Sequence, residues 1–264
     1  MDRMEEGVVP VSTGENSAAG RSKRRALIEI AIAYGLILAV IWTPRPWQKL
    51  LWWAAVAAVV VITCISWDGL KAMGLRTANF FRSLWVVGVA LAIAVAAALL
   101  AARLHTLRLP DSPLQFVKTY WAYAVWAGVQ QFLLQCFFLA RLVRVFPRPK
   151  QAAVAAAGLF ALAHLPSPIL ASATVIWGIA SCLIFLHYRN LYPLAIAHAI
   201  FGIAIAITIP GHVDHNMRVG WGYLIYGREH HRPHHFNQSD QSASTVAWVT
   251  ADAPTLRSRI QARP

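Results

Sequence analysis

Long apolar segments separated by short polar and basic ones form the dominant pattern of this chain. With a window of about 19 residues, segments that match a membrane-spanning helix are found at 26–44, 48–66, 84–101, 117–140, 151–166, 168–187 and 191–210. The strands of a membrane barrel would instead alternate apolar and polar residues over about ten positions. The pattern therefore predicts an all-α fold, a polytopic transmembrane helical bundle of about seven spans.

The fifth segment is the weakest of the seven. It is shorter than the ~20 residues of a full crossing, and it ends in Leu165-Pro166-Ser167-Pro168, where two prolines interrupt the pattern. A half-span at this place would change the number of crossings.

Composition agrees with a membrane protein and suggests three regions. Hydrophobic residues make up 58% of the 264 positions, against about 45–50% in soluble domains. We expect a basic cytoplasmic tail at 1–25, the helical bundle at 26–210 and a His-rich tail at 211–264 that is partly disordered. No cleavage signature follows the first apolar segment, so we expect that segment to stay as an anchor.

The net charge of +13 comes from residues at the ends of apolar segments rather than from one continuous stripe, which argues against a nucleic-acid partner. Basic residues precede the first span and follow the second and fourth: Arg21, Lys23, Arg24, Arg25, Lys71, Arg76, Arg82, Arg141, Arg144, Arg148 and Lys150. The positive-inside rule then predicts a multi-pass cell (inner) membrane protein with a cytoplasmic N-terminus. Seven spans would put the final tail outside, although that tail also carries Arg218, Arg228 and Arg232.

A few polar side chains interrupt the fourth, fifth and seventh spans. They form three short groups: Gln130-Gln131 with Gln135, Phe160 with His164, and His198 with Gly202. Residues four apart share a helix face, and polar groups are costly inside a membrane, so they mark either a site or hydrogen bonds between helices. The pattern predicts an uncharged cavity among these three spans.

The order and spacing of these groups resemble the three motifs of the CPBP superfamily, written Glu-Glu-x-x-x-Arg, Phe-x-x-x-His and His-x-x-x-Asn. That superfamily includes CAAX-processing endopeptidases and bacterial intramembrane proteases, and the similarity covers roughly residues 70–205. The resemblance implies a CAAX-protease-like fold. It implies catalytic roles at the positions of His164, His198, Gln130, Gln131 and Gln135, and substrate contact at those of Phe160 and Gly202.

The chain departs from the family pattern at four positions. Gln130 and Gln131 replace the two glutamates, Gln135 replaces the arginine, and Gly202 replaces the asparagine. In active relatives a motif glutamate is thought to activate water. A glutamine amide cannot take a proton from water near neutral pH. We therefore expect glutamate-dependent proteolysis to be reduced or absent, with a motif histidine as the alternative base.

The tail contains a second group of histidines, His212-Val213-Asp214-His215 and His230-His231-Arg232-Pro233-His234-His235. The latter matches one His-x-x-His-His box of di-iron membrane desaturases, which is weak evidence when it occurs alone. The short aromatic stretch 219–226 is expected to lie at the membrane surface, where it could fold over the cavity mouth.

Three functions stay open at this stage. The first is an intramembrane endopeptidase that cleaves a membrane-anchored peptide or protein substrate. The second is an inactive CPBP-like binding or scaffold protein in contact with membrane lipids, and the third is a di-iron lipid-modifying enzyme. No cofactor and no metal site are predicted with confidence, since the spans combine no set of metal ligands.

Overall fold

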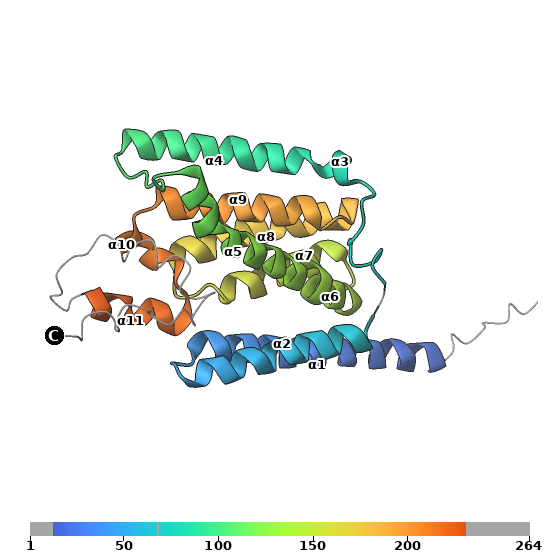
Figure 1. Ribbon diagram of the computed structural model, residues 1–264. Coiled ribbons are helices and arrows are strands. Elements are labelled where there is room, and N and C mark those ends of the chain that lie inside the picture. The colour runs from blue at the N-terminus through green and yellow to red at the C-terminus, as the bar shows by residue number, and fades with distance from the viewer. Residues whose placement is uncertain (1–12, 68, 231–264) are drawn as a thin grey trace, which may run out of the picture.

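The computed structural model describes residues 13–67 and 69–230, which fold into helices joined by short loops (Figure 1). The long helices are α1 (Thr13–Trp42), α2 (Trp47–Ile65), α4 (Trp85–Arg103), α5 (Pro113–Phe132), α7 (Pro149–Leu162), α8 (Pro168–Tyr188) and α9 (Tyr192–Thr208). Shorter elements are α3 (Phe80–Ser83), the π-helix η1 (Leu133–Leu139), α6 (Ala140–Val145), α10 (Gly211–Asp214), the 3₁₀-helix η2 (His215–Met217) and α11 (Gly220–His230). The predicted all-α class is confirmed.

Helix starts follow local sequence signals. A proline stands in the first turn of α5, α7, α8 and α9, where its missing N–H costs nothing. Two of these helices are also capped by serine. The Ser112 hydroxyl accepts a hydrogen bond from the backbone N–H of Gln115 at 3.2 Å, and the Ser167 hydroxyl accepts one from Leu170 at 3.4 Å. These signals fix where α5 and α8 begin.

The seven long helices run alternately between two ends of the molecule. At one end the Ser66 hydroxyl donates to Glu29, and the carbonyl of Tyr188 accepts from Arg76. At the other end Arg108 N–H donates to the carbonyl of Ile207 at 2.8 Å. The first end, on the right of Figure 1, gathers the basic loops that the sequence assigned to one side. We call it the basic end.

Two of the seven helices are shorter than a full crossing. By length and composition, five helices of the described chain can span a bilayer: Gly20–Trp42, Trp47–Ile65, Phe80–Arg103, Pro113–Val145 and Pro168–Tyr188. A sixth results if Tyr192–Thr208 and Gly211–Met217, which are bent by 115° at their junction, count as one broken span. Helix α7 has 14 residues, about 21 Å at 1.5 Å per residue. The seven predicted helices are thus present in order, but α7 is too short for a hydrocarbon core of ~30 Å.

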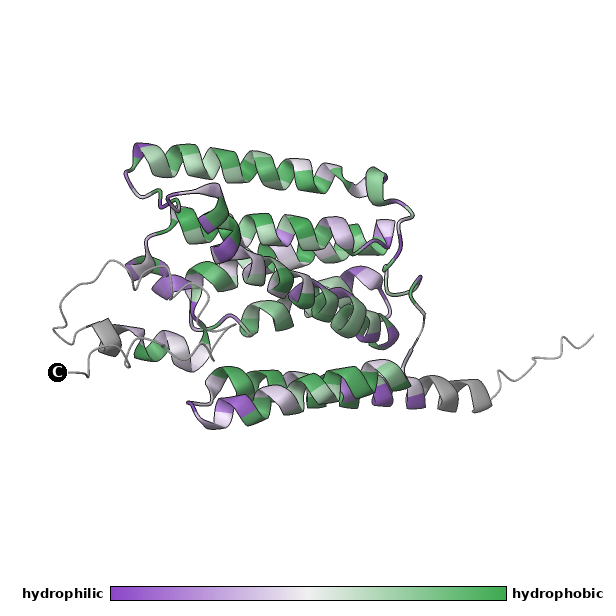
Figure 2. Cartoon of the chain, in the orientation of Figure 1, coloured by the Kyte–Doolittle hydropathy of each residue, from purple (hydrophilic) through white to green (hydrophobic). Residues whose placement is uncertain are grey.

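The outer surface of the bundle is apolar. Figure 1 shows α1 and α2 as a hairpin along one side and α4 along the opposite side. Figure 2 shows apolar residues along the outer helices. Leu99 on α4 and Ile176 on α8 are 65% and 72% exposed. In water such surfaces would aggregate, whereas in lipid they are solvated.

The segment Pro113–Val145 lies at the centre of the bundle and is its most buried span. Its middle turn, η1, is a π-helix, a form that often occurs at functional positions. Phe137 and Leu139 of this turn are buried, and Phe138 packs edge-to-face on Tyr34 of α1 with ring centroids 5.9 Å apart. The π-turn begins two residues after Gln131 and contains Gln135.

Small residues allow α7 and α8 to pack closely. Ala153 and Ala157 are buried, and a Cβ at Gly178 would stand 2.9 Å from the Cβ of Ala157. Close approach through Gly and Ala is the usual means of helix association in membranes. This contact holds the short helix α7 in place and so positions Phe160 near its end.

Candidate functional site

A continuous chain of hydrogen bonds joins α9, the central span and α8. The Gln131 amide Nε2 lies 3.0 Å from Nδ1 of His198. One turn later, Nε2 of Gln135 donates to Oε1 of Gln131 at 3.2 Å and to the hydroxyl of Ser181 at 3.1 Å. All four side chains are buried. The structure therefore brings together the first and third motifs, and it adds Ser181, which the sequence did not single out.

The second motif completes the group. The Phe160 ring packs edge-on against both histidines, with centroids 4.8 Å from His164 and 5.7 Å from His198. Nδ1 of His164 lies 2.7 Å from the carbonyl oxygen of Phe160. Because a carbonyl only accepts, Nδ1 carries the hydrogen, and in the neutral ring Nε2 keeps its lone pair. Phe160 thus contacts both imidazoles.

The tautomer of His198 depends on the orientation of the Gln131 amide. With Nε2 of Gln131 as donor, Nδ1 of His198 accepts and its Nε2 carries the proton. With the amide turned over, Nδ1 donates to the amide oxygen and Nε2 becomes a base. In both orientations the partner of His198 is a neutral amide, whereas the family motif places a carboxylate there.

Gly202 permits a close approach that sequence reasoning missed. A Cβ at Gly202 would overlap the hydroxyl group of Tyr123 on α5. Tyr123 is buried and stands eight positions before Gln131, so the series Tyr123, Ala127 and Gln131 follows one face of the helix. The four-residue spacing between Tyr123, Ala127 and Gln131 is the sequence signal from which this contact could have been expected. The Tyr123 hydroxyl covers the backbone at the position where the family has asparagine.

Gln130 is half-buried and, within the described residues, takes no part in the chain of hydrogen bonds. Trp177 of α8 is a neighbour that the sequence did not indicate. Its ring lies 6.3 Å from His198 and 5.0 Å from Phe201 between centroids. Its indole N–H is buried and has no acceptor among the described residues. An unused donor therefore stands beside the paired histidine.

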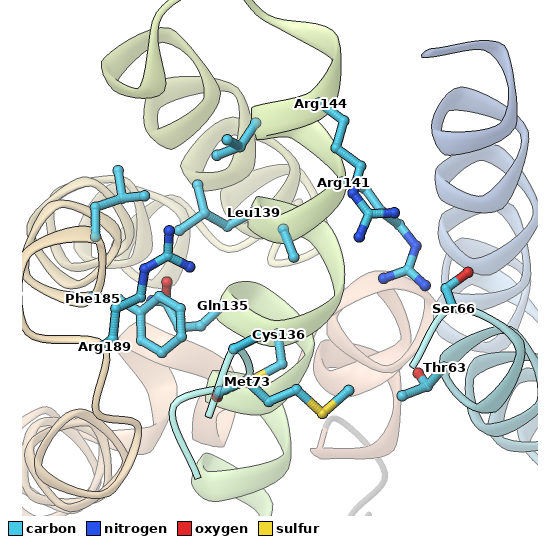
Figure 3. A pocket seen from close by; sticks show the side chains of 14 residues that line it. Thr63, Ser66, Met73, Gln135, Cys136, Leu139, Arg141, Arg144, Phe185 and Arg189 are labelled. Carbon is cyan, nitrogen blue, oxygen red and sulfur yellow. The ribbon is translucent and has the colours of Figure 1, made fainter. Parts of the chain in front are cut away.

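The cavity expected among the fourth, fifth and seventh spans stays a prediction. The structure has a cavity of about 210 Å³ beside the central span, lined by α2, the loop before α3, η1, α6 and α8 (Figure 3). Of the predicted site residues, Gln135 alone lines it. Aromatic rings of Phe160, Trp177 and Phe201 pack around His198 instead.

No set of three or more His, Cys, Asp or Glu side chains that could hold a metal occurs in the described part of the chain. His231, His234 and His235 lie outside the described residues, so the di-iron alternative is untested. His215 stacks on Tyr223 with centroids 3.9 Å apart.

The aromatic stretch predicted to fold over the cavity mouth forms most of α11. Its first residue, Gly220, donates its backbone N–H to the carbonyl of Leu165 at 2.8 Å. Leu165 directly follows His164, so α11 begins next to the loop of the second motif. That place is at the opposite end of the bundle from the cavity of Figure 3.

Three polar motifs that meet inside a bundle with membrane-span helices support an integral membrane protein of the CPBP type. Residues 112–204 match the model of the Rce1-like family, described as type II CAAX prenyl endopeptidase Rce1-like. That segment includes every residue of the three motifs, and the match is consistent with the CPBP superfamily, as the resemblance implied. No curated protein and no solved structure matches the chain.

Proposed function

We propose that this protein binds a ligand within the membrane without cleaving peptide bonds by glutamate-activated water. The observation that carries the proposal is the 3.0 Å contact between the Gln131 amide and His198. Removal of a proton from water needs a base with a lone pair and a suitable pKa, and a neutral amide is not one. The Gln131 amide can orient a ligand or the histidine, and it cannot activate water.

Among the described residues from 20 to 208, no other carboxylate is placed to take over the role. Between residues 20 and 208, the described residues include two, Glu29 and Asp111. Glu29 is occupied by Arg25 and Arg141 at 2.8 and 2.7 Å, and Asp111 lies exposed in the loop before α5. What the site offers is a set of neutral hydrogen-bonding groups. The unused N–H of Trp177 beside His198 suits an acceptor such as a carbonyl oxygen.

A second candidate is an endopeptidase that uses a histidine as base. It is favoured by His164, whose Nδ1 is held by the carbonyl of Phe160 and whose Nε2 keeps a lone pair in the neutral ring. In that mechanism His164 or His198 takes the proton of water, and Gln130 or Gln131 binds the substrate carbonyl. The substrate would be a membrane-anchored peptide or protein.

The two candidates differ in whether His198 controls cleavage. Membranes that contain the wild-type chain, the His198→Ala variant or no added chain are compared by mass spectrometry of their peptides. We expect the three peptide sets to agree. Products that appear with the wild type and vanish with His198→Ala would overturn the binding proposal in favour of the peptidase.

A second pair of variants tests the missing base directly. In Gln130→Glu/Gln131→Glu the carboxylates of the family return to the site, and we expect cleavage products to appear that the wild type lacks. Gln115→Glu, on the same helix but before the buried stretch, is the matched control and should yield none. Such a gain would mean that the side chains around Gln130 and Gln131 still have the geometry of the family although the glutamates are absent.

A further inference from the structure

The cavity beside the central span is lined by two buried side chains whose polar atoms have no hydrogen-bond partner among the described residues. It holds about 210 Å³, the liquid volume of roughly seven water molecules at ~30 Å³ each. The two residues are Gln135 of η1 and Thr63 of α2, and Figure 3 shows them on opposite sides of the space. We infer that the cavity binds the polar end of a neutral glycerolipid that carries a free hydroxyl group beside an ester, as a diacylglycerol does.

Gln135 presents one half of its amide to a ligand. Its Nε2 is used by Gln131 and Ser181, whereas its Oε1 is buried and has no donor among the described residues. A buried acceptor in this state is unfavourable until a donor reaches it. If the amides of Gln131 and Gln135 are both turned over, the atom without a partner is an N–H donor instead. A hydroxyl group satisfies either one, because it both donates and accepts.

Thr63 presents a hydroxyl group that its own helix does not use. A threonine within a helix can donate to the carbonyl one turn earlier, as Thr174 does to Leu170 at 2.7 Å. Thr63 is 8% exposed, yet its hydroxyl has no such partner in the described chain. The carbonyl oxygen of an ester would accept its hydrogen. The two walls therefore suit a ligand with a hydroxyl group and a nearby carbonyl group.

The rest of the lining favours a lipid over water or a soluble alcohol. Met73, Leu139 and Phe185 give an apolar surface for the glycerol carbons and the first methylene groups of the acyl chains. Water would need two to four polar partners for each molecule, which such a surface does not supply. The cavity is open to the surface near the ends of α2 and α8, at the basic end, where the polar part of a membrane lipid lies.

The unpartnered groups also favour a neutral headgroup. Gln135 and Thr63 are both uncharged, so a hydroxyl and an ester satisfy them without bringing a new charge into a buried space. Arg141, which also lines the cavity, is already paired with Glu29 at 2.7 Å. His164 and His198 do not line the cavity. Lipid binding here is therefore separate from the ligand binding proposed for the candidate site.

Thermal unfolding of the purified full-length chain in a neutral detergent tests this binding. Apparent affinities follow from the dependence of Tm on ligand concentration. The probes are dioctanoylglycerol, the dioctanoyl ester of propane-1,2-diol, which lacks the free hydroxyl, and glycerol at the same concentrations. The variant is Thr63→Val, which keeps the shape of the side chain and removes the hydroxyl. Thr119→Val is the matched control, since Thr119 is a half-buried threonine of α5 that does not line the cavity.

We expect dioctanoylglycerol to raise Tm in a saturable way and glycerol to leave it unchanged. The propanediol ester should bind about fivefold more weakly than dioctanoylglycerol, the factor for one ordinary hydrogen bond. Thr63→Val should unfold at the same Tm as the wild type or higher without lipid, because it loses no hydrogen bond, and should bind dioctanoylglycerol about fivefold more weakly. Thr119→Val should bind like the wild type.

The same measurements can overturn the site or its occupant. Equal affinity for the propanediol ester would show that no hydroxyl group is recognised. Unchanged affinity in Thr63→Val, or an equal fall in Thr119→Val, would place the lipid elsewhere on the bundle. Absence of a saturable shift with dioctanoylglycerol would overturn the binding itself, and equal stabilisation by glycerol would overturn the lipid as the occupant.

Discussion

The two arginines that share Glu29 should contribute very differently to stability. Arg25 and Arg141 both place Nε on this carboxylate, at 2.8 and 2.7 Å. The side chain of Arg25 is 55% exposed and that of Arg141 is 5% exposed. An exposed ion pair contributes about 0–1 kcal/mol because water and salt screen it. A buried partner that loses its counter-charge costs about 3–5 kcal/mol.

The perturbation is the removal of one charge at a time. Glu29→Gln removes the counter-charge that Glu29 supplies to the buried Arg141 at 2.7 Å. Arg141 keeps its hydrogen bond to the carbonyl of Phe137 at 3.0 Å and its position 3.7 Å above the Phe137 ring. These contacts reduce the penalty. We therefore expect the free energy of unfolding to fall by about 3 kcal/mol, near the lower end of the range for a broken buried ion pair. Arg25→Gln removes the exposed partner and should cost less than about 1 kcal/mol.

A double variant separates charge from packing. Glu29→Gln/Arg141→Met removes both charges and keeps an apolar side chain on Phe137, so it should recover about 2 kcal/mol relative to Glu29→Gln alone. The assay is equilibrium unfolding in mixed detergent, followed by the loss of helical circular dichroism. Equal costs for Arg25→Gln and Glu29→Gln, or no recovery in the double variant, would refute the claim that burial of Arg141 sets the magnitude.

The remaining predictions concern the candidate site. Gly202→Ala should lower the free energy of unfolding by about 1–3 kcal/mol because its methyl group overlaps the Tyr123 hydroxyl. Adding Tyr123→Phe to this variant should recover part of the loss. Gly128→Ala is the control, since nothing lies within 4 Å of its Cβ position; it should stabilise the protein by about 0.4–1 kcal/mol. Gln135→Leu should cost about 1–3 kcal/mol because it leaves the buried oxygen of Gln131 without a donor. The same unfolding assay checks all of these, and a neutral Gly202→Ala would show that α5 and α9 can separate freely.

The sequence predicted the helices well because their limits are marked by local signals. The predicted span at 168–187 differs by one residue at its C-terminal end from α8, Pro168–Tyr188, which begins at a serine cap and a proline. The seventh, at 191–210, corresponds to α9, Tyr192–Thr208. Both limits rest on proline and on the change from apolar to polar residues, which can be read without any tertiary contact.

Features that depend on side-chain volume could not be predicted in the same way. The four-residue spacing placed Gln131 and Gln135 on one helix face, where the structure joins them by a hydrogen bond. The packing of Phe160, Trp177 and Phe201 near His198 depends on tertiary contacts that the spacing does not contain. The π-turn at Leu133–Leu139 has no sequence signal of its own, and it changes the faces that Gln135 and the following residues present.

The three glutamine substitutions are best understood together as the conversion of a charged site to a neutral one. An arginine at position 135 would stand fully buried, and Glu29, the carboxylate of the central region among the described residues, already pairs with Arg141. Gln135 instead donates to Gln131 and Ser181, and Gln131 contacts His198. A chain of neutral groups can be satisfied at low cost in a dry interior, where a lone charge cannot. The same change leaves Gln135 with an acceptor toward the cavity. The uncharged motif and the polar wall of the cavity therefore both follow from the same glutamines.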